Sequence, residues 1–207
     1  MPTVEQASRW YPADDPVHGF DHVLRVMRSA EEIGEELGAD LELLRAAALL
    51  HDAAGADPRE NRAQHERASA DFAREVLANE GWPPDRIEAV VECVLSHRYR
   101  GKQRPDSLEA QILFDADKLD VVGAFGVART LGYAMQAGQP MFAEPSDHFV
   151  ETGQTIAGEP HSAYHEYLFK LQNVRKRLHT EPAKRKAAAR EAVLRQFFEQ
   201  LAAEARG

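Results

Sequence analysis

The chain has 207 residues, of which 43% are apolar and 29% are charged, which is the balance of a folded globular protein rather than of a disordered or fibrous one. Its net charge of −9 disfavours broad binding to nucleic acid or to an anionic membrane, because the summed field repels polyanions. The single cysteine, Cys93, can neither close an intramolecular disulfide nor build a thiolate metal site, which fits a reducing, cytoplasmic compartment.

The sequence predicts neither a signal peptide nor a membrane span. The first 16 residues contain no apolar segment of the kind that a secretory signal requires. The longest apolar stretch with only glycine interrupting it covers residues 121–128, far short of the roughly 20 residues that cross a bilayer. We therefore expect a cytoplasmic protein with no membrane partner and no nucleic-acid partner.

Four amphipathic helices are predicted in the first half of the chain. Apolar residues recur there at intervals of three and four positions. Gly38 ends the first helix and Asp40 caps the second, while Pro83 and Pro84 suit the first turn of the fourth. The expected ranges are about 23–37, 41–50, 63–79 and 83–95.

The second half of the chain has a less regular pattern. A basic loop covers residues 98–105, and a longer helical segment is expected from about Ser107 through Val122, with glycines beyond it that weaken its continuation. Residues 139–160 show no clear period, which predicts a mobile insert or a lid over a site. Two further helices are expected, one through residues 164–178 and one over 182–203.

These elements predict an all-α fold. No convincing series of alternating strands and no internal repeat is present. No linker rich in proline, glycine and serine divides the chain into halves that could each bury a core. We therefore expect one domain over residues 1–207, a bundle of about seven helices.

Polar side chains interrupt the apolar stripes of five helical segments. Burying an imidazole or a carboxylate is costly unless a partner takes its lone pairs. A lone histidine on an apolar face is usually a hydrogen-bonded core residue, but five such positions on different helices point to convergent metal ligands. They are His22, His51, His65, His97 and Asp117, with Asp52 adjacent to His51.

Three motifs taken in chain order resemble the HD superfamily of metal-dependent phosphohydrolases. They are His18-Gly-Phe-Asp-His22-Val-Leu-Arg25-Val, then His51-Asp52 at a helix end, then Asp115-Ala-Asp117-Lys-Leu-Asp120. Residues 123–129 and 165–171 also look like one branch, the stand-alone bacterial HD proteins of about 200 residues that resemble nucleotide pyrophosphohydrolases. The resemblance runs from about Asp15 to Leu201 and implies the HD-domain fold.

The resemblance implies that His22, His51, Asp52 and Asp117 bind a divalent metal ion. Two imidazoles and two carboxylates without a thiolate suit Mn²⁺ best or Fe²⁺, and they also accept Ni²⁺, Co²⁺ or Zn²⁺, whereas Mg²⁺ is less favoured. Four protein ligands leave positions for water and a phosphate oxygen. The proposed catalytic residues are Asp52 and Asp117, either of which can orient the water that attacks phosphorus.

An acidic protein must neutralise a polyphosphate locally. The basic loop supplies Arg98 and Arg100, because guanidinium groups bind phosphate. Arg25 is three residues from His22 and projects near the same helix face, and Lys118 and Lys170 match positions of the family. A basic loop is also commonly a solvated surface, and each isolated cation can simply pair with a carboxylate.

His65 and His97 are open to three interpretations. They can contact the substrate or support the metal ligands, they can hold a second metal as in dinuclear members of the superfamily, or they can be satisfied core histidines. Among the substrate activities of the superfamily, guanosine tetraphosphate hydrolysis is disfavoured. The acidic pair that follows His-Asp in those enzymes is replaced here by residues 53–56, Ala-Ala-Gly-Ala.

The favoured function is hydrolysis of (deoxy)nucleoside triphosphates to monophosphate and pyrophosphate. The expected partner is thus a small phosphorylated molecule, preferably a nucleotide, and the sequence predicts no particular oligomeric state. The alternatives are a phosphomonoesterase or cyclic phosphodiesterase, since one metal site can attack different phosphorus esters, and a non-catalytic HD protein that senses a nucleotide.

Overall fold

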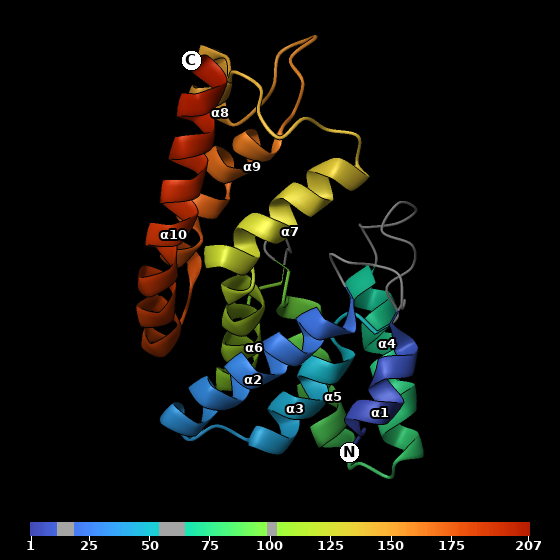
Figure 1. Ribbon diagram of the computed structural model, residues 1–207. Coiled ribbons are helices and arrows are strands. Elements are labelled where there is room, and N and C mark those ends of the chain that lie inside the picture. Colours follow the sequence, from blue (N-terminus) through green and yellow to red (C-terminus); the bar gives the residue numbers. More distant parts are fainter. Residues whose placement is uncertain (12–18, 54–64, 99–102) are drawn as a thin grey trace. The chain divides into compact units, whose positions relative to one another are not determined.

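The computed structural model describes residues 1–11, 19–53, 65–98 and 103–207 (Figure 1). These residues form helices, turns and loops with no strand among them, which confirms the all-α prediction. They divide into two compact units. Unit 1 is Met1–Leu119 with Leu178–Ala183, and unit 2 is Asp120–Arg177 with Lys184–Gly207. The single-domain assignment of the whole chain stays a prediction.

Ten α-helices and three short 3₁₀ helices occur in the described residues, more than the seven or so expected. Unit 1 contains α1 (Val4–Ala7), η1 (Ser8–Trp10), α2 (Phe20–Leu37), α3 (Leu41–Leu50), α4 (His65–Asn79), α5 (Pro84–Ser96) and α6 (Leu108–Leu119). Unit 2 contains α7 (Gly123–Gln136), α8 (Asp147–Thr152), α9 (Ala163–Phe169), η2 (Leu171–Asn173), η3 (Arg175–Arg177) and most of α10 (Glu181–Arg206). None of the helices in these ranges combines the length and the apolar character that crossing a membrane demands.

Local signals set the ends of the helices in unit 1. Gly38 ends α2 with φ of 70°, a left-handed conformation that glycine adopts without steric cost. The Asp40 carboxylate caps α3 by accepting a hydrogen bond of 3.0 Å from the backbone N–H of Leu43. Pro84 is the first residue of α5. The boundaries predicted around these residues are confirmed.

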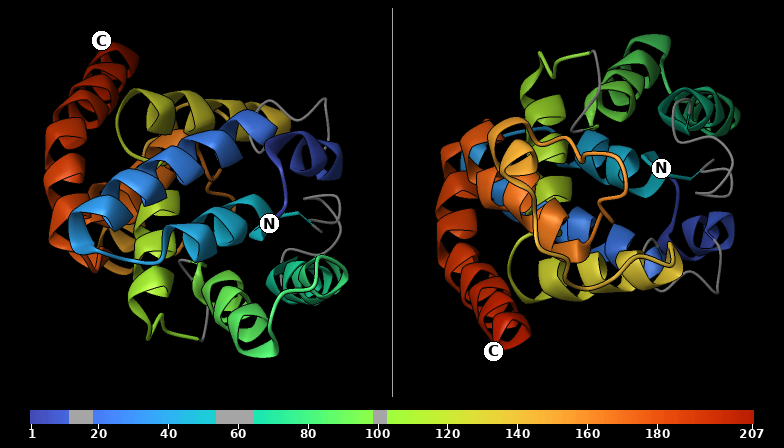
Figure 2. Two further views of the ribbon diagram at one scale, coloured as in Figure 1. Left: turned by 90° about the horizontal axis from the view of Figure 1, so that it is seen from below. Right: turned by 90° about the horizontal axis from the view of Figure 1, so that it is seen from above.

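The core of unit 1 is built by α2, α3, α5 and α6. Helix α2 packs against α3 and α6, and α3 also contacts α5, while α4 packs mainly along α5 (Figure 2). The apolar stripes of these helices are fully buried, including Val26, Ile33, Leu44, Val90 and Leu113. At roughly 25 cal/mol per Å² of apolar area buried, this packing fixes the backbone from which the polar residues of the stripes project.

The helical segment expected from Ser107 through Val122 ends three residues early, and a second helix follows it. Helix α6 ends at Leu119, Val122 is extended with φ of −121° and ψ of 149°, and α7 starts at Gly123 with φ of 79°. A Cβ at Gly126 would lie 2.4 Å from the carbonyl oxygen of Val121. Only a glycine at position 126 therefore allows the connecting turn to pack this closely on α7.

The segment 139–160, predicted as a lid or a mobile insert, contains helix α8. The Glu159 carboxylate links residues on either side of α8. It accepts hydrogen bonds from the backbone N–H and the hydroxyl of Ser146 and from the backbone N–H of Ile156. These bonds lower the pKa of Glu159 to about 2, with the bond from the Ser146 backbone the largest contribution. The role of a lid stays a prediction.

The helix expected through residues 164–178 is shorter than predicted. Helix α9 ends at Phe169, and two 3₁₀ turns, η2 and η3, follow it before Leu178. The backbone of Lys170, with φ of −116° and ψ of −55°, leaves the α-helical path. The single helix predicted there is wrong over its second half.

Replacing Gly126 by alanine should destabilise the protein by about 2 kcal/mol, because the new Cβ meets the backbone at Val121 and overpacking costs roughly 1–3 kcal/mol. Urea unfolding followed by circular dichroism measures the effect. Gly138→Ala is the control, because a Cβ there meets nothing within 4 Å and only the left-handed backbone costs about 1 kcal/mol. Equal losses for the two variants would contradict the close approach.

Candidate metal centre

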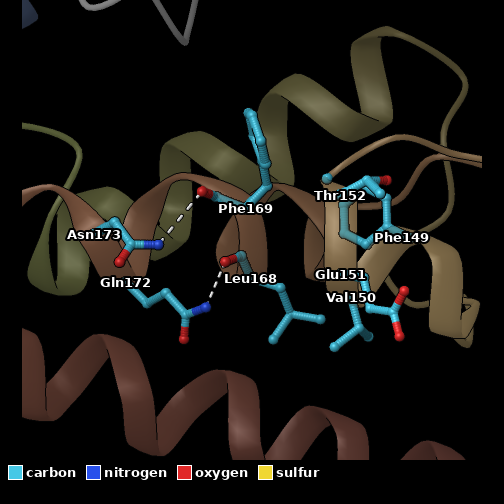
Figure 3. Close-up of a pocket in the computed structure, with 9 residues that line it drawn as sticks. Phe149, Val150, Glu151, Thr152, Leu168, Phe169, Gln172 and Asn173 are labelled. Carbon is cyan, nitrogen blue, oxygen red and sulfur yellow. Dashed lines mark hydrogen bonds between the residues drawn. The ribbon is translucent and has the colours of Figure 1, made fainter.

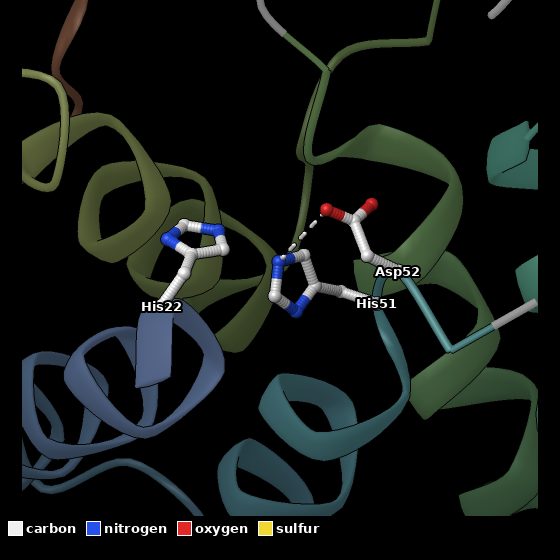
Figure 4. Close-up of side chains that lie close together, drawn as sticks. All are labelled: His22, His51 and Asp52. Carbon is white, nitrogen blue, oxygen red and sulfur yellow. Dashed lines mark ion pairs between the residues drawn. The ribbon is translucent and has the colours of Figure 1, made fainter. Parts of the chain in front are cut away.

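Three of the predicted metal ligands meet where the first turn of α2 approaches the end of α3. His22 projects from α2, His51 is the residue that follows the last residue of α3, and Asp52 is next to it (Figure 4). One ligand atom from each lies within 4.8 Å of the other two. His22 and His51 are 1% and 0% exposed, so both imidazoles lie inside unit 1.

The fourth predicted ligand, Asp117, comes from α6. Its Oδ1 atom lies 3.5 Å from Nε2 of His22, and the residue is buried. Residues separated by up to 95 positions in the sequence are thereby brought together from α2, α6 and the end of α3. This is the convergence that the polar positions on the apolar stripes predicted.

The orientation of His51 leaves one nitrogen available to a ligand. Its Nδ1 atom lies 2.8 Å from the carbonyl oxygen of Ala48, so the Nδ1–H donates to that carbonyl and the lone pair of Nε2 faces Asp52. Within the described part of the chain, Nε2 of His51 and Oδ1 of Asp52 are buried and have no hydrogen-bond partner. Such atoms are costly to bury, and a bound cation would satisfy both. The residues present therefore fit a divalent metal ion.

A second group of three ligand atoms uses the same aspartate. Nε2 of His65 and Nε2 of His97 each lie 3.3 Å from Oδ1 of Asp52, and the three atoms are all within 4.8 Å of one another. Nδ1 of His97 bonds to the carbonyl oxygen of Val94, so its Nε2 also faces the site. Asp52 thus presents Oδ1 to this pair and Oδ2 to His51, at 3.5 Å.

The protonation states suit metal binding. Burial lowers the pKa of His51 to about 4, which keeps the imidazole neutral at pH 7. Burial alone would raise the pKa of Asp117, but Lys118 and the imidazoles of His22 and His51 hold it well below its usual range. The pKa of Asp52 is lowered likewise, because His51, His65 and His97 outweigh its burial. Neutral imidazoles and ionised carboxylates are the forms that bind cations.

Two predicted phosphate contacts in unit 1 are paired with acids beside the site. Nη1 of Arg25 lies 2.5 Å from Oδ2 of Asp21 on the same helix. The ammonium of Lys118 contacts Oδ2 of Asp117 and lies 5.3 Å from the ring centre of Phe114. Because Lys118 is buried and Asp117 Oδ1 points to His22, the lysine holds the orientation of this carboxylate.

Glu66 is a further residue of the site, which the sequence did not predict. Its carboxylate accepts a hydrogen bond of 2.9 Å from Arg98 and lies 3.7 Å from Nδ1 of His65. Glu66 thus links Arg98 to His65. Nothing in the sequence distinguishes Glu66 from the other acids of a solvated helix face. The other predicted arginine of the basic loop, Arg100, lies outside the described residues.

The last predicted contact, Lys170, belongs to unit 2, where its ammonium lies 3.0 Å from Oε1 of Glu166. Unit 2 also contains a cavity of about 330 Å³ (Figure 3). The amide groups of Gln172 and Asn173 at its edge donate back to the carbonyls of Leu168 and Phe169. The remaining lining is Phe149, Val150, Glu151, Thr152 and Gly153, which offers no group of metal ligands.

Comparison with known proteins gives consistent matches. A model of the HD domain family matches residues 19–122. The protein YpgQ of Bacillus subtilis (strain 168) is 30% identical over 188 residues, which cover 89% of this chain and 82% of YpgQ.

Solved structures match over nearly the whole chain. A structure of B. subtilis YpgQ in complex with ADP has a TM-score of 0.74 at 25% identity, covering 98% of this chain and 97% of that one. A Lactobacillus plantarum protein has a TM-score of 0.75 at 30% identity, covering 97% and 93%. A predicted HD superfamily hydrolase from an uncultured Thermotogales bacterium has a TM-score of 0.63 at 27% identity, covering 97% and 88%.

Protonation of His51 should make the metal-free protein less stable at acid pH. The unfolded chain binds this proton near pH 6.5, whereas the folded chain binds it only near pH 4. The stabilisation is therefore present above pH 6.5 and is lost as the pH falls towards 4, by up to about 3 kcal/mol. Urea unfolding in chelator across this range measures it. His51→Asn should remove this part of the pH dependence, and an unchanged slope would contradict the assignment.

Asp52→Asn should lower the affinity for Mn²⁺ by about 100-fold, because this carboxylate is a ligand candidate in both groups. Titration calorimetry of the metal-free protein measures the affinity. Asp71→Asn is the matched control, since its carboxylate is 78% exposed and pairs with Arg74 on α4. Equal affinity of Asp52→Asn and the control would exclude Asp52 as a ligand.

Proposed function

The chain belongs to the HD domain family, and on that premise we propose that it is a metal-dependent phosphohydrolase that cleaves nucleoside triphosphates to monophosphate and pyrophosphate. The observation that carries the proposal is a pair of buried atoms that have no hydrogen-bond partner among the described residues, Nε2 of His51 and Oδ1 of Asp52. They lie at the centre of a group of imidazoles and carboxylates. A site of this composition favours cation binding over a merely structural role.

The proposed ligands are His22, His51, Asp52 and Asp117. Two imidazole nitrogens and two carboxylates favour Mn²⁺, with Fe²⁺, Ni²⁺, Co²⁺ or Zn²⁺ as further candidates and Mg²⁺ less favoured. A divalent ion at this position would lower the pKa of a water molecule and polarise a phosphoryl oxygen.

In the proposed reaction Asp52 and Asp117 orient the attacking water. Both pKa values lie below the usual range of a carboxyl group, so these carboxylates accept a hydrogen bond from water and remain ionised. Lys118 keeps Asp117 in place through its contact with Oδ2. As the bond to the leaving pyrophosphate breaks, positive side chains stabilise the charge that develops on its oxygens.

Nucleotide binding draws support from one relative and from the charges beside the site. YpgQ has been crystallised in complex with ADP. In unit 1, Arg25 and Arg98 are paired with Asp21 and Glu66 through contacts of 2.5 and 2.9 Å. A polyphosphate can replace these carboxylates as the anionic partner, since guanidinium groups bind phosphate bidentately. We propose Arg25, Arg98, Arg100 and Lys118 as phosphate contacts, while the role of Lys170 stays a prediction from the sequence.

His65 and His97 are proposed substrate contacts beside Oδ1 of Asp52. A second divalent ion is the competing assignment, and the observation that favours it is the 4.8 Å group in which both imidazoles share Asp52. Because Nδ1 of His97 bonds to the Val94 carbonyl, a phosphate oxygen would need a proton on Nε2 of His97, whereas a second ion needs the lone pair of that nitrogen. The number of ions bound per chain separates the two assignments.

The function is tested by incubating the Mn²⁺-loaded protein with ribonucleoside and deoxyribonucleoside triphosphates and identifying the phosphorus products by ³¹P nuclear magnetic resonance. We expect monophosphate and pyrophosphate in equal amounts. Release of orthophosphate alone would indicate a phosphomonoesterase, and turnover of cyclic nucleotides alone a phosphodiesterase. Tight nucleotide binding with no product after prolonged incubation would indicate a sensor. Each of these three results contradicts the proposal.

His97→Ala should leave one Mn²⁺ per chain and raise KM for the triphosphate about tenfold, because the variant removes a substrate contact. Metal content after gel filtration and steady-state kinetics measure the two effects. The control is His148→Ala, whose imidazole is exposed on α8 of unit 2. Two ions in the unaltered protein and one in His97→Ala would instead assign this histidine to a second metal.

A further inference from the structure

A short N-terminal segment, residues 3–11, precedes the part of the chain that matches the HD domain model. Thr3 and Gln6 form a reciprocal capping box that starts α1. Ala7 is fully buried, and the ring of Trp10 meets that of Phe72 on α4 edge to face, with ring centres 5.2 Å apart. The segment is therefore folded and docked within unit 1.

Tyr11, at the end of this segment, reaches the turn that bears two of the proposed ligands. Its ring lies 5.5 Å from that of Phe20, the first residue of α2, and the residue is 7% exposed. Its hydroxyl donates a hydrogen bond of 2.9 Å to the carbonyl oxygen of Leu49. Burial and the charge of Asp52 raise the pKa of Tyr11 well above its usual value, so the hydroxyl keeps the proton that it donates.

The Tyr11 hydroxyl gives a carbonyl at the end of α3 a hydrogen-bond partner. The last carbonyls of a helix have no partner within the helix. Three consecutive carbonyls here find three different partners: that of Ala48 bonds Nδ1 of His51, that of Leu49 bonds Tyr11, and that of Leu50 bonds the N–H of Ala53. Tyr11 is the only one of these partners that comes from outside the turn itself.

The direction of the Asp52 side chain depends on this turn. Residues 51–53 lie beyond the last residue of α3, so regular helical hydrogen bonds do not fix their backbone. Asp52 must nevertheless place Oδ2 3.5 Å from His51 and Oδ1 3.3 Å from both His65 and His97. A rotation of its backbone would displace the carboxylate from both groups of ligand atoms at once.

We propose that Tyr11 is a positioning residue for the metal centre, whose hydroxyl holds the Leu49 carbonyl and so keeps the His51-Asp52 turn that follows it in its ligand-binding geometry. This inference rests on the metal-binding part of the proposed function. It does not require that the protein cleaves a triphosphate. Groups that orient metal ligands in this way typically change metal affinity or activity by 10–100-fold when they are removed.

The test is Tyr11→Phe, which keeps the ring against Phe20 and removes the hydroxyl. We expect the affinity of the metal-free protein for Mn²⁺, measured by calorimetry, to fall at least tenfold, and the visible spectrum of the Co²⁺-loaded protein to change. With triphosphate at saturating Mn²⁺, kcat should fall while KM stays within twofold.

Ile33→Val is the matched control for lost stability. Ile33 is fully buried on α2, three turns from His22, and this substitution typically costs 0.5–1.5 kcal/mol. It should leave Mn²⁺ affinity and the Co²⁺ spectrum unchanged. The increase in melting temperature on adding Mn²⁺ gives a further readout for a destabilised variant, because it depends on the affinity of the folded state, and it should shrink only in Tyr11→Phe.

The outcomes separate this inference from the proposed function. If Tyr11→Phe binds Mn²⁺ as tightly as the unaltered protein, or if Ile33→Val weakens binding equally, the positioning role is wrong while the proposed function stands. If the unaltered protein binds Mn²⁺ but cleaves no triphosphate, the proposed activity fails and the affinities still decide the role of Tyr11. If the unaltered protein binds no Mn²⁺, both fail.

Discussion

The buried and unsatisfied ligand atoms at the end of α3 are the constraint on which the rest of unit 1 depends. Nε2 of His51 and Oδ1 of Asp52 have left water without gaining a hydrogen-bond partner among the described side chains, which is costly in a packed interior. The apolar stripes of α2, α3 and α6 offset that cost by burying the surrounding surface. The protein thus retains a locally unfavourable arrangement that a bound cation would convert into a favourable one.

Neighbouring groups hold the proposed ligands in place. The Ala48 carbonyl fixes the orientation of the His51 ring through its contact with Nδ1. The Tyr11 hydroxyl bonds the Leu49 carbonyl, just before the turn that bears His51 and Asp52. On α6, Asp115 is buried and accepts hydrogen bonds from the backbone N–H groups of His179 and Thr180 and from the Thr180 hydroxyl. Asp115 therefore anchors α6 to His179 and Thr180, while Asp117, two positions later, faces the site.

Sequence reasoning predicted what local patterns and convergent polar positions determine. The helix ends at Gly38 and Asp40 follow from backbone freedom and capping within a few residues, and His22 and Asp117 were found because each interrupts an apolar stripe. The contact of Tyr11 with Leu49 spans 38 positions and has no local pattern. The break after α6 depends on the close approach of Val121 to Gly126. The spacing of apolar residues in the sequence does not reveal this contact.

The central claim is that His22, His51, Asp52 and Asp117 bind one divalent ion in common. Anomalous diffraction at the manganese absorption edge, from crystals grown with Mn²⁺, tests it most directly. We expect a strong peak within coordination distance, about 2.0–2.3 Å, of a nitrogen or oxygen atom of each of the four side chains. A crystal saturated with Mn²⁺ whose anomalous density shows no peak among these residues would contradict it.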